Sequence, residues 1–63
     1  MMEPSDVTVG ASYLVQRSDH QWHNAVVLQQ RAGSAAGGHT EYYVHYDGHN
    51  RRLDEWVPIG RLR

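Results

Sequence analysis

The sequence contains no cysteine, no lysine and no phenylalanine. Without cysteine it has no disulfide and no thiolate zinc site, a composition that fits a reducing compartment. Without lysine it has no amine for Schiff-base chemistry and no site for lysine acetylation. No apolar run approaches the roughly 20 residues that span a bilayer, and the first residues do not resemble a signal peptide. We therefore expect a soluble intracellular protein that makes no membrane contact.

The chain has 63 residues, which is enough for one small domain whose packing depends on a few large side chains. Its formal net charge of -1 argues against a general polyanion binder. All six basic residues are arginines. Because the arginine fork pairs bidentately with anions and stacks on flat rings, local recognition remains possible despite the low net charge.

Neither catalysis nor a metal site is indicated by the sequence. No serine lies in a motif with a base beside it, and side chains would fill the interior of a domain this small and leave no room for a catalytic pocket. Five histidines invite a metal interpretation, but they have no thiolate or regularly spaced carboxylate beside them. We expect no catalytic residue, no metal and no cofactor in this segment.

Residues 1–8 are predicted to be a disordered lead-in, followed by one domain over residues 9–63. Aromatic and β-branched residues separated by turn signals predict short strands. The strand candidates are residues 13–17, 22–31, 40–46 and 50–57. A helix competes over 22–31, since short apolar runs are ambiguous by periodicity alone.

The remaining segments connect these strands. Residues 32–39 are rich in glycine and alanine and predict a mobile loop without packing capacity. Pro58 ends the last strand because it has no N–H to donate, and residues 59–62 then form a helical turn or a short closing strand. Several short strands favour a small barrel or curled sheet, which hides its own edges.

Candidate binding residues follow the third predicted strand. Tyr46 stands beside the Asp47-Gly48 turn, where we expect a rim-facing ring that holds a cation or stacks a base. For Arg51 and Arg52 two interpretations stay open. They pair locally with the two acids that follow them, or they form a basic lip that contacts phosphate or an acidic partner. Trp56 is the first choice for the core.

Residues 41–46 (EYYVHY) and 50–57 (NRRLDEWV) closely resemble the signature of chromo-barrel domains, also called tudor-knot domains, in MYST-family histone acetyltransferases. The branch most similar to this chain is that of the males-absent-on-the-first and Esa-like enzymes. The resemblance implies an all-β, curled five-stranded barrel of the SH3-like or tudor-like kind with a short C-terminal helical turn. It also implies a nuclear protein whose acetyl-CoA-dependent, zinc-containing catalytic domain lies outside this segment.

The resemblance also suggests which residues bind a ligand. In relatives that bind methyl-lysine, aromatic rings form a cage, and its positions map to His23, Tyr46, His49 and Leu53. Because Leu53 has no π face and His49 replaces a larger aromatic residue, this cage is incomplete.

Three functions remain open, each for a monomeric, non-catalytic module that targets chromatin. The first is weak binding of RNA or DNA through Tyr46, Arg51 and Arg52, by stacking and phosphate pairing. The second is reading of a methylated histone tail by the reduced cage of His23, Tyr46 and His49. The third is docking to subunits of an acetyltransferase complex, for which the sign is an exposed apolar patch away from Tyr46.

Overall fold

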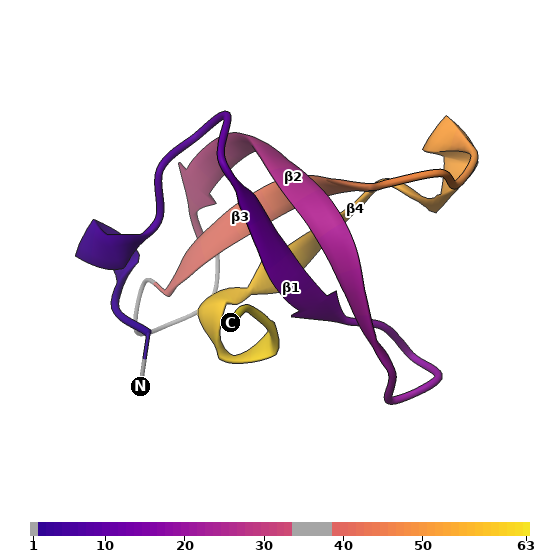
Figure 1. Cartoon of the computed structure of the whole chain (residues 1–63). Coiled ribbons are helices and arrows are strands. Elements are labelled where there is room, and N and C mark those ends of the chain that lie inside the picture. Colours follow the sequence, from indigo (N-terminus) through magenta and orange to yellow (C-terminus); the bar gives the residue numbers. More distant parts are fainter. Residues whose placement is uncertain (1, 34–38) are drawn as a thin grey trace.

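The computed structural model describes residues 2–33 and 39–63 and shows one antiparallel sheet (Figure 1). Its strands, in the order β1-β2-β3-β4, are β1 (Ser12–Gln16), β2 (Trp22–Ala32), β3 (Thr40–Tyr46) and β4 (Glu55–Pro58). Three short 3-10 turns accompany them: η1 (Pro4–Asp6), η2 (Arg51–Leu53) and η3 (Ile59–Arg61). The predicted all-β class is confirmed, and the competing helix over residues 22–31 is excluded.

The prediction of five strands is wrong, because the described residues form four. Pro58 ends β4, and the chain then turns through η3 instead of extending further. It reaches β1 only through a single bridge between Val15 and Leu62, supported by reciprocal backbone hydrogen bonds of 2.8 and 3.0 Å between Leu14 and Arg63. The segment 59–62 thus supplies both the helical turn and the closing contact that the sequence left as alternatives.

Alternation along the strands builds the core. Seven side chains are 0% exposed: Val15, Ala25, Val27, Tyr42, Val44, Tyr46 and Val57. The β3 residues among them are spaced by two, as the period of a strand requires. A register shift between Val27 and Gln29 interrupts the β2 pattern, and Leu28 is 42% exposed there.

Part of the lead-in predicted over residues 1–8 has defined structure among the described residues. Pro4–Asp6 forms η1, and Val7 is only 8% exposed and belongs to the core. The Tyr13 hydroxyl accepts a hydrogen bond from the Thr8 amide at 2.7 Å. These contacts attach the described lead-in residues to β1.

Left-handed backbone occurs in the turns that follow β1 and β3. Gly48 follows β3 with φ +74°, as the Asp47-Gly48 turn predicted, whereas His20 has φ +64° between β1 and β2. Most of the loop predicted over 32–39 lies outside the described residues. Among the residues the structure describes, no helix is both long and apolar enough to traverse a bilayer.

Candidate nucleic-acid interface

Tyr46 is a buried residue, so the prediction that its ring faces solvent at the rim is wrong. It shares the inward face of β3 with Tyr42 and Val44, and its exposed fraction is 0%. Its hydroxyl donates a 2.6 Å hydrogen bond to Oε2 of Glu55. Burial, and then this contact with a carboxylate, raise the pKa of Tyr46 far above its usual value.

The residues predicted to form a reduced cage do lie together. The ring centroids of His23 and His49 are 6.1 and 6.4 Å from that of Tyr46 and 5.7 Å from each other, all with edge-on geometry. The guanidinium carbon of Arg17 lies 5.1 Å from the centroid of the Tyr46 ring. Rings at these separations pack against one another, and the cation at Tyr46 is the chain's own arginine. Leu53, the fourth mapped position, is 38% exposed.

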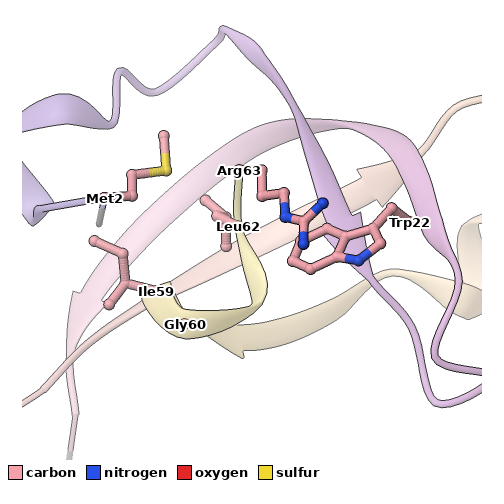
Figure 2. Close-up of a pocket in the computed structure, with 6 residues that line it drawn as sticks. All are labelled: Met2, Trp22, Ile59, Gly60, Leu62 and Arg63. Atoms are coloured by element: carbon pink, nitrogen blue, oxygen red, sulfur yellow. The ribbon is translucent and has the colours of Figure 1, made fainter.

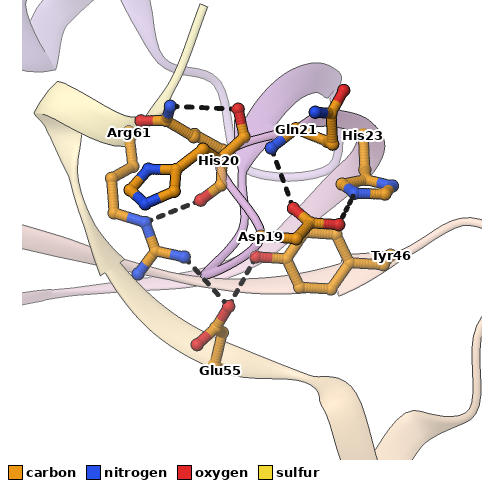
Figure 3. Close-up of polar contacts among 8 residues, drawn as sticks. Asp19, His20, Gln21, His23, Tyr46, Glu55 and Arg61 are labelled. Atoms are coloured by element: carbon orange, nitrogen blue, oxygen red, sulfur yellow. Dashed lines mark hydrogen bonds and ion pairs between the residues drawn. The ribbon is translucent and has the colours of Figure 1, made fainter.

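A polar network that the sequence did not reveal fixes this region (Figure 3). Glu55 Oε2, which accepts from Tyr46, also lies 3.2 Å from Nη2 of Arg61. Arg61 Nε donates to the carbonyl oxygen of Gln16 at 2.7 Å, so the network joins β3, β4, η3 and β1. It clamps the barrel where the end of the chain meets β1.

The turn between β1 and β2 is held by a second set of polar contacts. Asp19 Oδ1 accepts from the Gln21 amide at 2.8 Å, and Asp19 Oδ2 lies 3.1 Å from Nε2 of His23. The hydrogen bond from the Gln21 amide is the main cause that lowers the pKa of Asp19, and the contact with His23 lowers it further. Asp19 thereby orients the imidazole that packs against Tyr46.

Arg51 and Arg52 are both exposed on η2. The turn that presents them is ordered by Asn50, whose side-chain oxygen accepts from the Arg52 amide at 2.9 Å. Gly48 supplies the positive φ that lets the chain leave β3 for this turn. His49, also exposed, stands next to η2 in the chain.

The two acids after these arginines do not pair with them. Asp54 Oδ1 lies 2.7 Å from Nδ1 of His45, and Glu55 belongs to the network with Tyr46 and Arg61. Within residues 2–33 and 39–63 no salt bridge or side-chain hydrogen bond engages either guanidinium of η2. The structure therefore favours the basic lip over the locally paired turn.

The other arginines have structural partners. Arg31 stacks over Trp56 at 4.0 Å and bonds Glu41 at 3.1 Å, while Arg63 stacks over Trp22 at 3.9 Å. Trp56 is half-buried and packs against Tyr43 on the outer face, with ring centroids 5.2 Å apart, so it is not the core residue that was predicted. Four of the six arginines therefore contact an aromatic ring, a carboxylate or a backbone carbonyl. Among the described residues, no such contact is seen for the guanidinium groups of Arg51 and Arg52.

No group of three or more potential metal ligands occurs among the described residues. What remains at this end of the barrel is a pair of solvated guanidinium groups beside an exposed imidazole, on a turn braced by a buried tyrosine. Such an arrangement pairs with anions and stacks flat rings, and it contains no nucleophile with its base.

A family model described as the Tudor-knot, "RNA binding activity-knot of a chromodomain", matches residues 7–63. The chain belongs to the Tudor-knot family. This Tudor-knot chain also matches the solution structure of the chromo barrel domain from the males-absent on the first (MOF) protein. The match has a TM-score of 0.76 and 38% identity and covers 100% of this chain and 75% of that one.

Curated relatives fall into two groups. Histone acetyltransferase MOF of Drosophila melanogaster is 51% identical over 79% of this chain and 6% of its own length. "Nuclear factor 7, ovary" of Xenopus laevis is 48% identical over 89% of this chain and 9% of its own. Histone acetyltransferase of the MYST family 1 of Arabidopsis thaliana is 43% identical over 86% of this chain and 12% of its own length. The Tudor-knot chain thus spans about a tenth of the relatives it matches, and similar domains occur in proteins with different names.

Proposed function

We propose that this Tudor-knot chain is a non-catalytic nuclear module that binds single-stranded RNA weakly through Arg51, Arg52 and His49. The observation that carries the proposal is the pair of solvated guanidinium groups on η2, whose neighbouring acids are engaged elsewhere. Guanidinium groups pair with phosphate oxygens, and an exposed imidazole stacks an unpaired base. The RNA-binding description of the matching family model supports the same ligand class.

His49, and not Tyr46 as predicted from the sequence, is the residue that stacks a base. Tyr46 has no exposed surface on which a base can lie, since Arg17 lies over its ring and the imidazoles of His23 and His49 pack edge-on beside it. Its role is to hold the end of β3, after which the chain forms η2 with its exposed arginines. The same packing disfavours a methyl-lysine reader, because a methylammonium would have to displace Arg17 from the tyrosine ring.

Two phosphate contacts make the affinity modest and dependent on salt. For a single strand, the logarithm of the association constant falls by about 0.7 per neutralised phosphate for each logarithmic unit of salt, which gives a slope of about -1.4 here. Raising the salt from about 50 to about 200 mM should then weaken binding roughly sevenfold. The net charge of -1 adds no long-range attraction to this local term.

Fluorescence anisotropy of a labelled single-stranded RNA tests the proposal. The Arg51→Gln/Arg52→Gln variant should lose roughly 25-fold in affinity near 0.1 M salt, together with most of the salt slope. Arg31→Gln is the matched control, because it removes the same kind of charge from β2, opposite the start of β3 and so far from η2, and it should bind like the wild type. Equal binding by the η2 variant and the control would refute the proposal.

The longer context of the relatives suggests where the module acts. The relatives are named as histone acetyltransferases or nuclear factors, so we infer that this domain helps to place a larger nuclear protein on chromatin-associated RNA. Acetyl-transfer chemistry, if the parent protein performs it, belongs to another domain. Fusing the wild-type or η2-variant domain to a fluorescent protein and comparing RNase-sensitive nuclear retention tests this inference.

A further inference from the structure

A concave site lies away from η2 and its exposed arginines. A pocket of about 550 Å³ is lined by Met2, Trp22, Ile59, Gly60, Leu62 and Arg63 (Figure 2). In Figure 1 the yellow C-terminal turn around this pocket is well separated from the orange η2, so the two surfaces belong to different parts of the barrel. The pocket thus supplies the apolar surface away from Tyr46 that a docking module requires.

The pocket has an apolar floor and one cation at its edge. Leu62 is 4% exposed and belongs to the core, and Met2 and Ile59 pack against that core while remaining half-buried. The volume lies in the range of sites that enclose a ligand, and it is ample for one large side chain. A Cβ built on Gly60 meets no atom within 4 Å, so the chain leaves this part of the pocket open.

Arg63 gives the pocket its selectivity. Its guanidinium stacks over the indole of Trp22 at 3.9 Å, which fixes the plane of the fork. No described residue accepts a hydrogen bond or forms a salt bridge with this guanidinium, so its N–H edge is available to a carboxylate. A stacked, pre-oriented guanidinium pairs bidentately with a carboxylate and loses little freedom in doing so.

We propose that this pocket binds a peptide segment of a partner protein in which a large apolar side chain adjoins an acidic residue. The apolar side chain enters the pocket between Ile59 and Trp22, and the neighbouring carboxylate pairs with Arg63. Pocket and segment are complementary, because the apolar cavity accepts the large side chain and the guanidinium at its edge pairs with an anion. This site is independent of the RNA contacts, so one domain can join an RNA to a protein.

Titration of the whole ¹⁵N-labelled chain with capped peptides tests this inference. The probe is Gly-Asp-Phe-Glu-Gly, compared with Gly-Asp-Ala-Glu-Gly and Gly-Lys-Phe-Lys-Gly. The two tryptophans give separate indole N–H signals, of which only that of Trp22 reports on the pocket. The first probe should shift Trp22 and leave Trp56 unchanged, and each control peptide should bind about tenfold more weakly or worse.

Variants separate binding from folding. Arg63→Gln should weaken the first probe roughly tenfold and Arg63→Lys by less, since lysine keeps the charge and loses the fork. Gly60→Leu should abolish binding, because its side chain has room to occupy the pocket. All three variants should keep the wild-type Trp56 signal and thermal unfolding curve. Equal binding of all three peptides, a response at η2 in place of Trp22, or shifts that follow protein concentration without peptide would overturn the proposal.

Discussion

Two buried tyrosines on the same face of β3 should respond in opposite ways to removal of their hydroxyl groups. Tyr42 and Tyr46 are both 0% exposed. The Tyr46 hydroxyl donates at 2.6 Å to the Glu55 carboxylate, whereas the Tyr42 hydroxyl has no hydrogen-bond partner among the described residues. The same change to phenylalanine therefore removes a satisfied group from one site and an unsatisfied group from the other.

The expected magnitudes follow from these partners. A hydrogen bond to a charged group contributes about 1.5–3 kcal/mol, and because the Glu55 side chain is 40% exposed and keeps Arg61, we expect Tyr46→Phe to cost about 1–2 kcal/mol. A buried hydroxyl without a partner costs about 1–3 kcal/mol of desolvation, so Tyr42→Phe should leave stability unchanged or raise it by about 1 kcal/mol. In a domain of this size, 1 kcal/mol corresponds to about 4–8 °C in Tm.

Thermal and urea unfolding of the wild type and the two variants, followed by circular dichroism, measures this difference. We expect a lower Tm for Tyr46→Phe and an equal or higher Tm for Tyr42→Phe, with equal m-values. Because the variants share the strand, the face and the deleted atom, each serves as the control for the other. A loss of stability in Tyr42→Phe as large as that in Tyr46→Phe would show that the hydrogen bond to Glu55 does not distinguish the two hydroxyl groups.

Further predictions concern pH and backbone strain. Because the pKa of Tyr46 is raised in the folded state, its contribution is complete below the unfolded value near 10 and is lost as pH rises above it. Above pH 10, Tyr46 should therefore contribute a loss of about 1.4 kcal/mol per pH unit to urea unfolding, and Tyr46→Phe should reduce the slope by that amount. Burial also raises the pKa of Tyr42, which supplies part of the slope that remains, and an unchanged slope in Tyr46→Phe would contradict the assignment. His20 holds φ +64°, so His20→Gly should stabilise the fold by roughly 0.5 kcal/mol and His20→Val should destabilise it. Identical denaturation midpoints for these two variants would show that the turn is not strained.

Much of the fold could be predicted because it depends on local pattern. The spacing of Tyr42, Val44 and Tyr46 indicated one shared face of a strand, and the Asp47-Gly48 turn was read from its residue types. The number of strands was harder, since a single bridge at Leu62 replaces a fifth strand once the 3-10 turn η3 forms. That outcome depends on how the sheet closes, which short-range patterns do not encode.

The candidate site was only partly predictable, because its contacts join distant segments. The sequence identified His23, Tyr46, His49, Arg51 and Arg52, and the structure brings the first three together. Nothing in the sequence showed that Arg17 would cover Tyr46. Nor did it indicate that Glu55 would contact Tyr46 and Arg61 instead of the η2 arginines. The alternation within β3 places Tyr46 on the same inward face as Tyr42 and Val44. Its position beside the turn, which suggested a solvent-facing ring, was less informative.

The register between β3 and β4 decides the position of Trp56. It lies opposite Tyr43, on the outer face, while its neighbour Val57 lies opposite Tyr42 and enters the core. A shift of one residue would exchange the two, and composition favours tryptophan for the interior. Arg31 then covers the outward indole, a long-range contact that the sequence did not suggest.

Chemical-shift mapping of a single-stranded RNA on the ¹⁵N-labelled domain shows whether RNA contacts η2. We expect the largest amide shifts at His49, Arg51 and Arg52, and their loss in the Arg51→Gln/Arg52→Gln variant. Shifts that centre on Trp22 and Arg63, or a map that the double substitution leaves unchanged, would contradict this expectation.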